Sequence, residues 1–285
     1  MSRVLKTLAL LLPLLLLGCP EGKDSPLAKL ARNVDIKETL QTAKQAFGEV
    51  DAEEERAIGR EAVAVLLGAV PLLDNDPLQR YVNRVGSWVA LHTERKELGW
   101  HFAILDSEDI NAFAAPGGYI FITKGLLSKM NSEAELAGTL AHETVHVLEK
   151  HHLAAVQKAA RLDLASALAR SQMDSDRDRR NMEKLSAGFR ELYSRGLDKG
   201  DEFEADRMGI VIATRSGYDP YGLPAVLQTL AGMNPGDASL AFLFKTHPPA
   251  SKRISLLERL FDRLDPYATQ PQVERRFREQ LALLK

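Results

Sequence analysis

Two histidines four residues apart, His142 and His146, constrain this chain more than any other feature, because a glutamate directly follows the first. On a helix, positions i and i+4 stand on one face about one turn apart, so both imidazoles can reach a single metal ion. Glu143 flanks the same face and can hold a water molecule as a general base. The sequence therefore predicts one helix that supplies two metal ligands and a base. The alternative is a surface helix that carries two unrelated histidines.

The composition indicates a globular chain without a nucleic-acid surface. Hydrophobic residues make up 45% of the 285 residues, enough for a good core in one large domain or two small ones. The formal net charge of −2 offers no electrostatic footprint for nucleic acid. The sequence also lacks zinc-finger spacing, a phosphate loop and a dinucleotide fingerprint.

The N-terminus has the pattern of a targeting segment. Arg3 and Lys6 precede an apolar run over residues 8–17 that is too short to span a bilayer, and the run closes on Gly18-Cys19. This pattern resembles a bacterial lipoprotein signal over residues 1–18, which implies cleavage before Cys19, lipid on that residue and a tether over residues 19–26. Pro20 follows the cysteine, which by the same resemblance favours the outer membrane. An ordinary secretory signal cut somewhat later is the alternative.

Cys19 is the only cysteine of the chain. If it carries lipid, the mature protein has no thiol. A metal site must then be built from histidine and carboxylate side chains.

The hydrophobic spacing predicts a mainly α fold with a small β-sheet (α+β). Helices are expected over residues 27–47, 53–70 and 76–98, and strands over 100–105 and 119–123 with the turn Pro116-Gly117-Gly118 between them. We expect the motif helix to begin at Ser132, which forms a capping box with Glu135, and to continue to about residue 169.

The later part of the chain is expected to be helical throughout. Residues 174–199 form either an exposed lid or a plain solvated helix, and further helices are expected over 200–215, from Asp219 onward and twice near the C-terminus. The chain thus divides into a metal-binding domain over residues 27–265 and a C-terminal helix over 266–285.

A catalytic metal needs a third protein ligand and one open position. His152 stands at the last position of the extended motif H-E-x-x-H-x-x-G-x-x-H, but Glu149 replaces the glycine that would turn the chain. Without that turn the helix continues, and six residues advance His152 by about 240° around the axis from His146. We therefore expect His151 and His152 on the helix surface, away from the metal.

The preferred third ligand is Glu202. Glu202 and Asp206 are four residues apart and share a helix face, while Glu204 lies on the other side. Glu202 can bind the metal, and Asp206 can accept a hydrogen bond from the second ring nitrogen of a ligand histidine. The alternative is an acidic helix start that the helix dipole stabilises.

The motif H-E-x-x-H followed by E-x-x-A-D resembles the zinc metallopeptidases related to the prenyl-protein endopeptidases, which include the bacterial HtpX, BepA and LoiP types. Three further stretches resemble the same family, namely residues 111–120 with Gly125-Leu126, residues 132–137, and Thr246-His247-Pro248-Pro249 with Arg253-Ile254. Together they cover roughly residues 50–265.

This resemblance implies a zincin-like metalloprotease domain built on the H-E-x-x-H helix. It implies one zinc ion per chain held by His142, His146 and Glu202, with Glu143 as the catalytic base and Asp206 in a supporting role.

Three further roles are left open by the sequence. His247 either occupies the open zinc position and holds the enzyme latent, as the resemblance implies, or is a helix-capping or core histidine before Pro248. Arg253 either stabilises the transition state or pairs with Asp206. The expected strand with Tyr119, Ile120 and Phe121 is a candidate edge along which an extended substrate adds.

These features favour a zinc-dependent endopeptidase of the bacterial cell envelope. We expect it to be lipid-anchored, to face the periplasm and to degrade misfolded or unassembled envelope proteins. A chaperone or assembly factor for outer-membrane proteins with latent protease activity is the alternative, and a zinc aminopeptidase is a third interpretation. The sequence does not determine the oligomeric state.

Overall fold

The computed structural model describes residues 49–158 and 197–284. The expected signal, Cys19, the tether, the helix over 27–47 and most of the helix over 174–199 lie outside these residues. Within the two described ranges, none of the helices has the length and apolar character needed to cross a bilayer.

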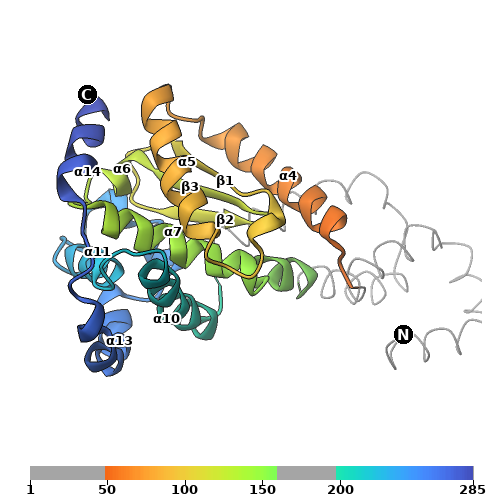
Figure 1. The fold of residues 1–285 in the computed structure, drawn as a ribbon. Coiled ribbons are helices and arrows are strands. Elements are labelled where there is room, and N and C mark those ends of the chain that lie inside the picture. The colour runs from red at the N-terminus through yellow and green to blue at the C-terminus, as the bar shows by residue number, and fades with distance from the viewer. Residues whose placement is uncertain (1–48, 159–196, 285) are drawn as a thin grey trace, which may run out of the picture.

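The strands that the structure describes form a three-stranded mixed sheet, which lies between helices in Figure 1. Its strands are β1 (His101–Leu105), β2 (Ala112–Ala115) and β3 (Tyr119–Thr123), in the order β1-β3-β2. β3 pairs with β1 in parallel and with β2 antiparallel. The two expected strands are confirmed. The turn at residues 116–118 joins β2 to β3, since a tight turn cannot join two parallel strands.

The expectation that β3 forms an edge strand is wrong. Tyr119, Ile120 and Phe121 have partners in both neighbouring strands, and Ile120 and Phe121 are buried. The intervening strand β2 has the sequence Ala-Phe-Ala-Ala, whose alanines have little strand preference, so the sequence pattern did not reveal it. Among the strands that the structure describes, β2 stands at the end of the sheet order, the position that was expected for β3.

Helices make up most of the described chain, as expected. The longer ones are α4 (Ala52–Ala69), α5 (Asp76–Ala90), α7 (Glu133–Leu148), α10 (Lys199–Arg215), α11 (Gly222–Ala231), α13 (Ala250–Leu264) and α14 (Glu274–Leu281). Short helices are η1 (Lys96–Leu98), α6 (Lys124–Leu127), η2 (Ala238–Leu240), α12 (Leu243–Thr246), η3 (Asp265–Tyr267) and η4 (Ala282–Leu284). Figure 1 shows α7 between the sheet and the helices α10 and α11.

The motif helix α7 is a core helix and not a surface helix. Ser132 caps it by accepting a hydrogen bond from the Glu135 amide at 3.2 Å, while the Glu135 carboxylate accepts from the Asn131 amide at 3.0 Å. Every α7 residue from Glu133 to Val147 is buried. A helix buried all round must be enclosed by other elements, so its histidines lie in the protein interior.

The helix ends at Leu148, so the expected continuation to residue 169 is wrong. Lys150 adopts a left-handed conformation with φ 57°, and a separate helical segment begins at residue 151. Distant residues stabilise this break. Arg95 donates a hydrogen bond to the Val147 carbonyl at 3.2 Å and forms an ion pair with the buried Glu55. The Glu55 carboxylate also lies 3.5 Å from Lys150 Nζ. No local pattern encodes these contacts.

The first residue of α7, Glu133, ties the C-terminal helix to the core. Its carboxylate is buried and accepts hydrogen bonds from the hydroxyls of Tyr81 at 2.7 Å and Tyr218 at 2.8 Å. Arg276 of α14 donates to both carboxylate oxygens, from Nε at 2.6 Å. Burial alone would raise the pKa of Glu133, but the hydrogen bonds from Arg276 and the two tyrosines hold it below its ordinary value.

Replacing Arg276 with methionine is expected to lower the free energy of unfolding by about 1–2 kcal/mol at pH 7, since Glu133 would stay buried without its half-exposed cationic partner. Because the folded pKa of Glu133 is depressed, this stability is present above its ordinary pKa of 4.5 and is lost as the pH falls below it. Urea unfolding at pH 7 and pH 3.5 checks this.

The difference in the free energy of unfolding between the wild type and Arg276→Met should therefore be smaller at pH 3.5 than at pH 7. The matched control is Arg275→Met on the same helix, whose side chain is 94% exposed and should contribute little. An equal difference in the free energy of unfolding at both pH values would show that Arg276 acts by packing alone.

Candidate metal centre

His142 and His146 point at one spot from the same face of α7. Their Nε2 atoms lie 3.1 Å apart and both residues are almost fully buried. Two ligands of one tetrahedral zinc ion stand roughly 3.3 Å apart, because each bond is about 2.0–2.1 Å. The spacing between the imidazoles therefore suits a shared metal ion.

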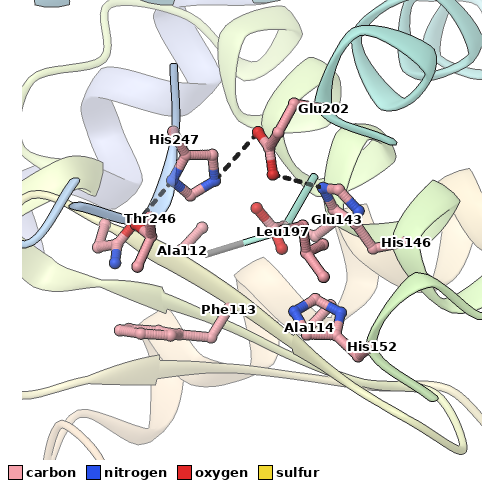
Figure 2. Close-up of a pocket in the computed structure, with 11 residues that line it drawn as sticks. Ala112, Phe113, Ala114, Glu143, His146, His152, Leu197, Glu202, Thr246 and His247 are labelled. Carbon is pink, nitrogen blue, oxygen red and sulfur yellow. Dashed lines mark hydrogen bonds and ion pairs between the residues drawn. The ribbon is translucent and has the colours of Figure 1, made fainter. Parts of the chain in front are cut away.

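Glu202 of α10 closes this group from the opposite helix (Figure 2). Its Oε1 lies 3.6 Å from His146 Nε2, and its Oε2 lies 3.7 Å from His142 Nε2. Glu202 is buried, and within the described part of the chain its Oε2 accepts no hydrogen bond. A buried carboxylate oxygen without a partner is costly, and a cation placed between the three side chains would satisfy it. The residues present thus fit a bound metal.

Glycine allows α10 to approach α7 closely enough for this contact. Gly209 lies two turns after Glu202, and a Cβ at Gly209 would stand only 2.9 Å from the backbone nitrogen of His142. Ala205, between them on the same face, is fully buried. Small residues at the crossing bring the two helix backbones together and so place the carboxylate against the imidazoles.

Burial sets the protonation state of the donors. It lowers the pKa of both His142 and His146, which favours the neutral imidazoles that metal binding requires. It raises the pKa of Glu202 to about 8, and burial together with the nearby Glu202 charge raises the pKa of Glu143 to about 8. A divalent cation would favour the ionised form of both carboxylates, so the site is electrostatically prepared for one.

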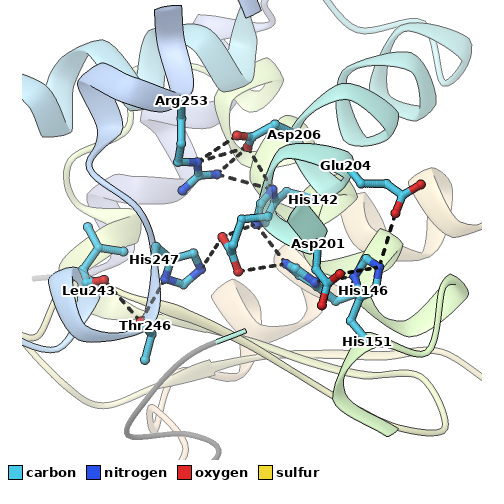
Figure 3. Close-up of polar contacts among 11 residues, drawn as sticks. His142, His146, His151, Asp201, Glu204, Asp206, Leu243, Thr246, His247 and Arg253 are labelled. Atoms are coloured by element: carbon cyan, nitrogen blue, oxygen red, sulfur yellow. Dashed lines mark hydrogen bonds and ion pairs between the residues drawn. The ribbon is translucent and has the colours of Figure 1, made fainter. Parts of the chain in front are cut away.

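Asp206 and Arg253 support His142 from behind (Figure 3). Asp206 Oδ1 lies 3.1 Å from His142 Nδ1, the contact expected from the sequence. Arg253 donates from Nε to Asp206 Oδ2 at 2.9 Å. Burial would raise the pKa of Asp206, but Arg253 and His142 hold it well below its ordinary range, so Asp206 stays ionised.

Of the two roles left open for Arg253, the structure shows the pairing with Asp206. The guanidinium approaches His142 from the Nδ1 side, with Nη2 at 3.3 Å, whereas the metal ligands meet at Nε2. Arg253 thus fixes Asp206, which in turn fixes the orientation of His142.

His247 lies on the open side of the ligand group. Its Nε2 is 3.7 Å from Glu202 Oε2, and the ligand atoms of His142, Glu202 and His247 all lie within 4.8 Å of one another. Its Nδ1 lies 2.9 Å from the Thr246 hydroxyl, so the other ring nitrogen faces the site. His247 is thus placed where a fourth donor would stand.

Residues 76–260 match the model of peptidase family M48. The chain belongs to this family. It is 29% identical over 268 residues to the beta-barrel assembly-enhancing protease of Yersinia pestis, covering 92% of this chain and 54% of that protein. The corresponding Escherichia coli protease is 28% identical over 76% of this chain and 46% of its own length. Mitochondrial metalloendopeptidase OMA1 of Schizosaccharomyces pombe is 26% identical, over 75% of this chain and 63% of its own length.

The chain spans about half the length of the two bacterial relatives. Membership of M48 confirms the expected zincin-like fold and metalloendopeptidase class. The described residues include one group in this M48 domain, His142, Glu202 and His247, whose ligand atoms are close enough together to hold a metal ion.

The prediction that His151 and His152 lie on the helix surface of this M48 domain is wrong. The break at Lys150 turns the chain back toward the site. His151 is buried with its Nδ1 3.0 Å from His146 Nδ1, and the His152 ring lies 5.5 Å from the His146 ring. Burial lowers the pKa of His152 to about 3. Helical spacing could not reveal this arrangement, because it depends on where the helix stops.

A cavity opens beside the metal site between α7 and the sheet (Figure 2). Glu143 lines it next to His146, on the side opposite β2. The β2 residues Ala112, Phe113 and Ala114 form part of its wall. The cavity thus lies between Glu143 and the β2 strand of the sheet.

Proposed function

We propose that this M48 metallopeptidase is a zinc-dependent endopeptidase of the bacterial cell envelope that degrades misfolded or unassembled envelope proteins. The observation that carries the proposal is the convergence of His142, His146 and Glu202 beside a cavity lined by Glu143. The similarity to the beta-barrel assembly-enhancing proteases supports the envelope setting.

The residues of the candidate site have separate roles in the proposed hydrolysis. A zinc ion bound here would supply Lewis-acid chemistry for the attack of water on a peptide carbonyl. Glu143 takes a proton from the attacking water and returns it to the leaving amine. Asp206 and Arg253 keep His142 in one tautomer and one orientation.

We propose that an extended substrate lies in the cavity beside β2, and not along β3 as expected from the sequence. The β2 residues Ala112, Phe113 and Ala114 face the cavity that Glu143 lines. Contacts to the substrate main chain depend little on side-chain identity, which favours broad specificity. Only extended, unfolded segments can adopt this pose, so folded proteins would escape cleavage.

The anchoring proposal rests on the sequence around Cys19. We propose that Cys19 carries lipid and that the domain faces the periplasm from the outer membrane. Metabolic labelling with a radioactive fatty acid tests this, since label should appear in the wild type and be lost in Cys19→Ser. Label in both would place the lipid elsewhere.

The test of the function is digestion of an unfolded protein by the purified mature chain. We expect cleavage of denatured casein that a chelator stops and added zinc restores. Peptides blocked at both ends should be cut internally, whereas an aminopeptidase would need free N-termini. If the zinc-loaded chain leaves both kinds of substrate intact, the proposal fails.

His247 is proposed to take the open ligand position and to limit activity. Replacing His247 with alanine is then expected to raise cleavage about tenfold, the effect of removing about 1.4 kcal/mol of competition at the site. Initial rates on unfolded casein measure it. A decrease in rate would instead show that His247 assists the reaction.

The same variant separates the protease from the second candidate, a chaperone with latent cleavage, which the placement of His247 beside Glu202 favours. A protease should bind clients in Glu143→Gln and cut them faster in His247→Ala. A chaperone with latent cleavage should bind clients in both variants, leave them intact in the wild type and begin to cut them only in His247→Ala.

A further inference from the structure

We propose that His151 is the positioning residue of the metal ligand His146, and that its Nδ1 accepts a hydrogen bond from His146 Nδ1. The two nitrogens lie 3.0 Å apart, and both rings are buried. The rings meet nearly edge to face, at an interplanar angle of 68° (Figure 3). This inference rests on the metal site of the proposed function and concerns how the site is held in place.

The direction of this hydrogen bond follows from the metal site. His146 Nε2 faces His142 and Glu202, so it must be unprotonated to bind a metal. The proton of a neutral His146 then resides on Nδ1, which becomes the donor. His151 Nδ1 must therefore be the acceptor, and the proton of a neutral His151 resides on its Nε2.

Two carboxylates face that outer N–H of His151. Its Nε2 lies 3.6 Å from Glu204 Oε2 and 4.0 Å from Asp201 Oδ1. Both belong to α10, the helix that also supplies Glu202. Negative charge near Nε2 favours the tautomer protonated there, so it reinforces the acceptor role of Nδ1. Glu204, which faces away from the ligands, thus acts on the site through His151.

The two ligand histidines are consequently supported by different groups. His142 contacts the carboxylate of Asp206 directly, whereas His146 contacts an imidazole that stands between it and the acidic side chains. The break in the helix makes this possible. His151 follows His146 by five residues, and only the left-handed turn at Lys150 brings it back onto the Nδ1 side.

The test compares two replacements of His151. His151→Phe keeps a flat ring but removes the acceptor, while His151→Asn places an amide oxygen near the original Nδ1. Outer contacts to a ligand histidine typically contribute 10–100-fold in metal affinity. We expect zinc affinity, measured by chelator competition, to fall by about 10–100-fold in the Phe variant and to be largely retained in the Asn variant.

The control is His101→Phe, an exposed ring on β1 that stacks on Tyr119 and should leave zinc affinity unchanged. Unchanged affinity in His151→Phe, or an equal loss in both His151 variants, would overturn the proposal. Thermal unfolding of the metal-free forms shows whether a variant is folded.

If His151→Phe does not fold, nitrogen NMR of the zinc-bound wild type decides the question. It should show His151 protonated at Nε2 and not at Nδ1, and the reverse tautomer would overturn the proposal. A wild-type chain that binds no zinc would instead remove the metal centre and the proposed function, a result distinct from any His151 effect.

Discussion

Replacing Glu143 with glutamine is expected to slow peptide-bond hydrolysis by about 10²–10⁴-fold, the usual contribution of a positioned general base. Glutamine has nearly the same shape, so the cavity and the ligand group should be preserved. It cannot accept the proton of the attacking water, so the loss should appear in kcat more than in KM. Cleavage of an internally quenched unfolded peptide measures the rate, and metal analysis should still find one zinc per chain.

The matched control is Glu149→Gln, at the exposed end of the same helix and outside the cavity. Its rate should equal that of the wild type. Two results for Glu143→Gln would contradict this prediction, and they have different meanings. A Glu143 variant that has lost its zinc would show that Glu143 stabilises the metal site, whereas one with full activity would show that another group acts as the base.

Part of the geometry of the candidate metal site could be predicted from the sequence because that part is local to each helix. Helical spacing places His142 and His146 on one face of their helix, and it does the same for Glu202 and Asp206. The arrangement within each pair therefore depends only on the helix that carries it. That the two pairs meet was an inference from the chemistry of the residue types. The packing at Gly209, which brings His142 and Glu202 together, is a tertiary feature without a signature in the motif.

The features that the sequence did not reveal depend on long-range contacts. The motif helix stops at Leu148 because Arg95 and Glu55, far away in the chain, satisfy the end of the helix and its left-handed turn. His151 reaches the site only through that turn. The order of the strands likewise depends on long-range contacts. The short alanine-rich strand β2 also lacks the β-branched residues that indicate a strand in a sequence.

Replacing Glu202 with glutamine is expected to have opposite effects on the metal-free and zinc-bound proteins. In the absence of metal, Glu202 is a buried carboxylate whose Oε2 accepts no hydrogen bond from the described residues, and burial raises its pKa to about 8. A neutral amide is less costly to bury, so the metal-free variant should unfold at a higher temperature than the wild type.

With zinc bound, the wild type should instead unfold at a higher temperature than the glutamine variant. A ligand at 100 times its Kd stabilises the folded state by about 2.7 kcal/mol. Zinc at such a concentration should therefore raise the Tm of the wild type. The glutamine variant has lost the only anionic ligand of the predicted set, so its shift and its proteolytic activity should both disappear. Asp198→Asn, at the start of the same helix with its side chain 81% exposed, should behave like the wild type. If the zinc-induced shift survived in Glu202→Gln, the carboxylate would not be a ligand, and α10 would have to contribute to the site by packing alone.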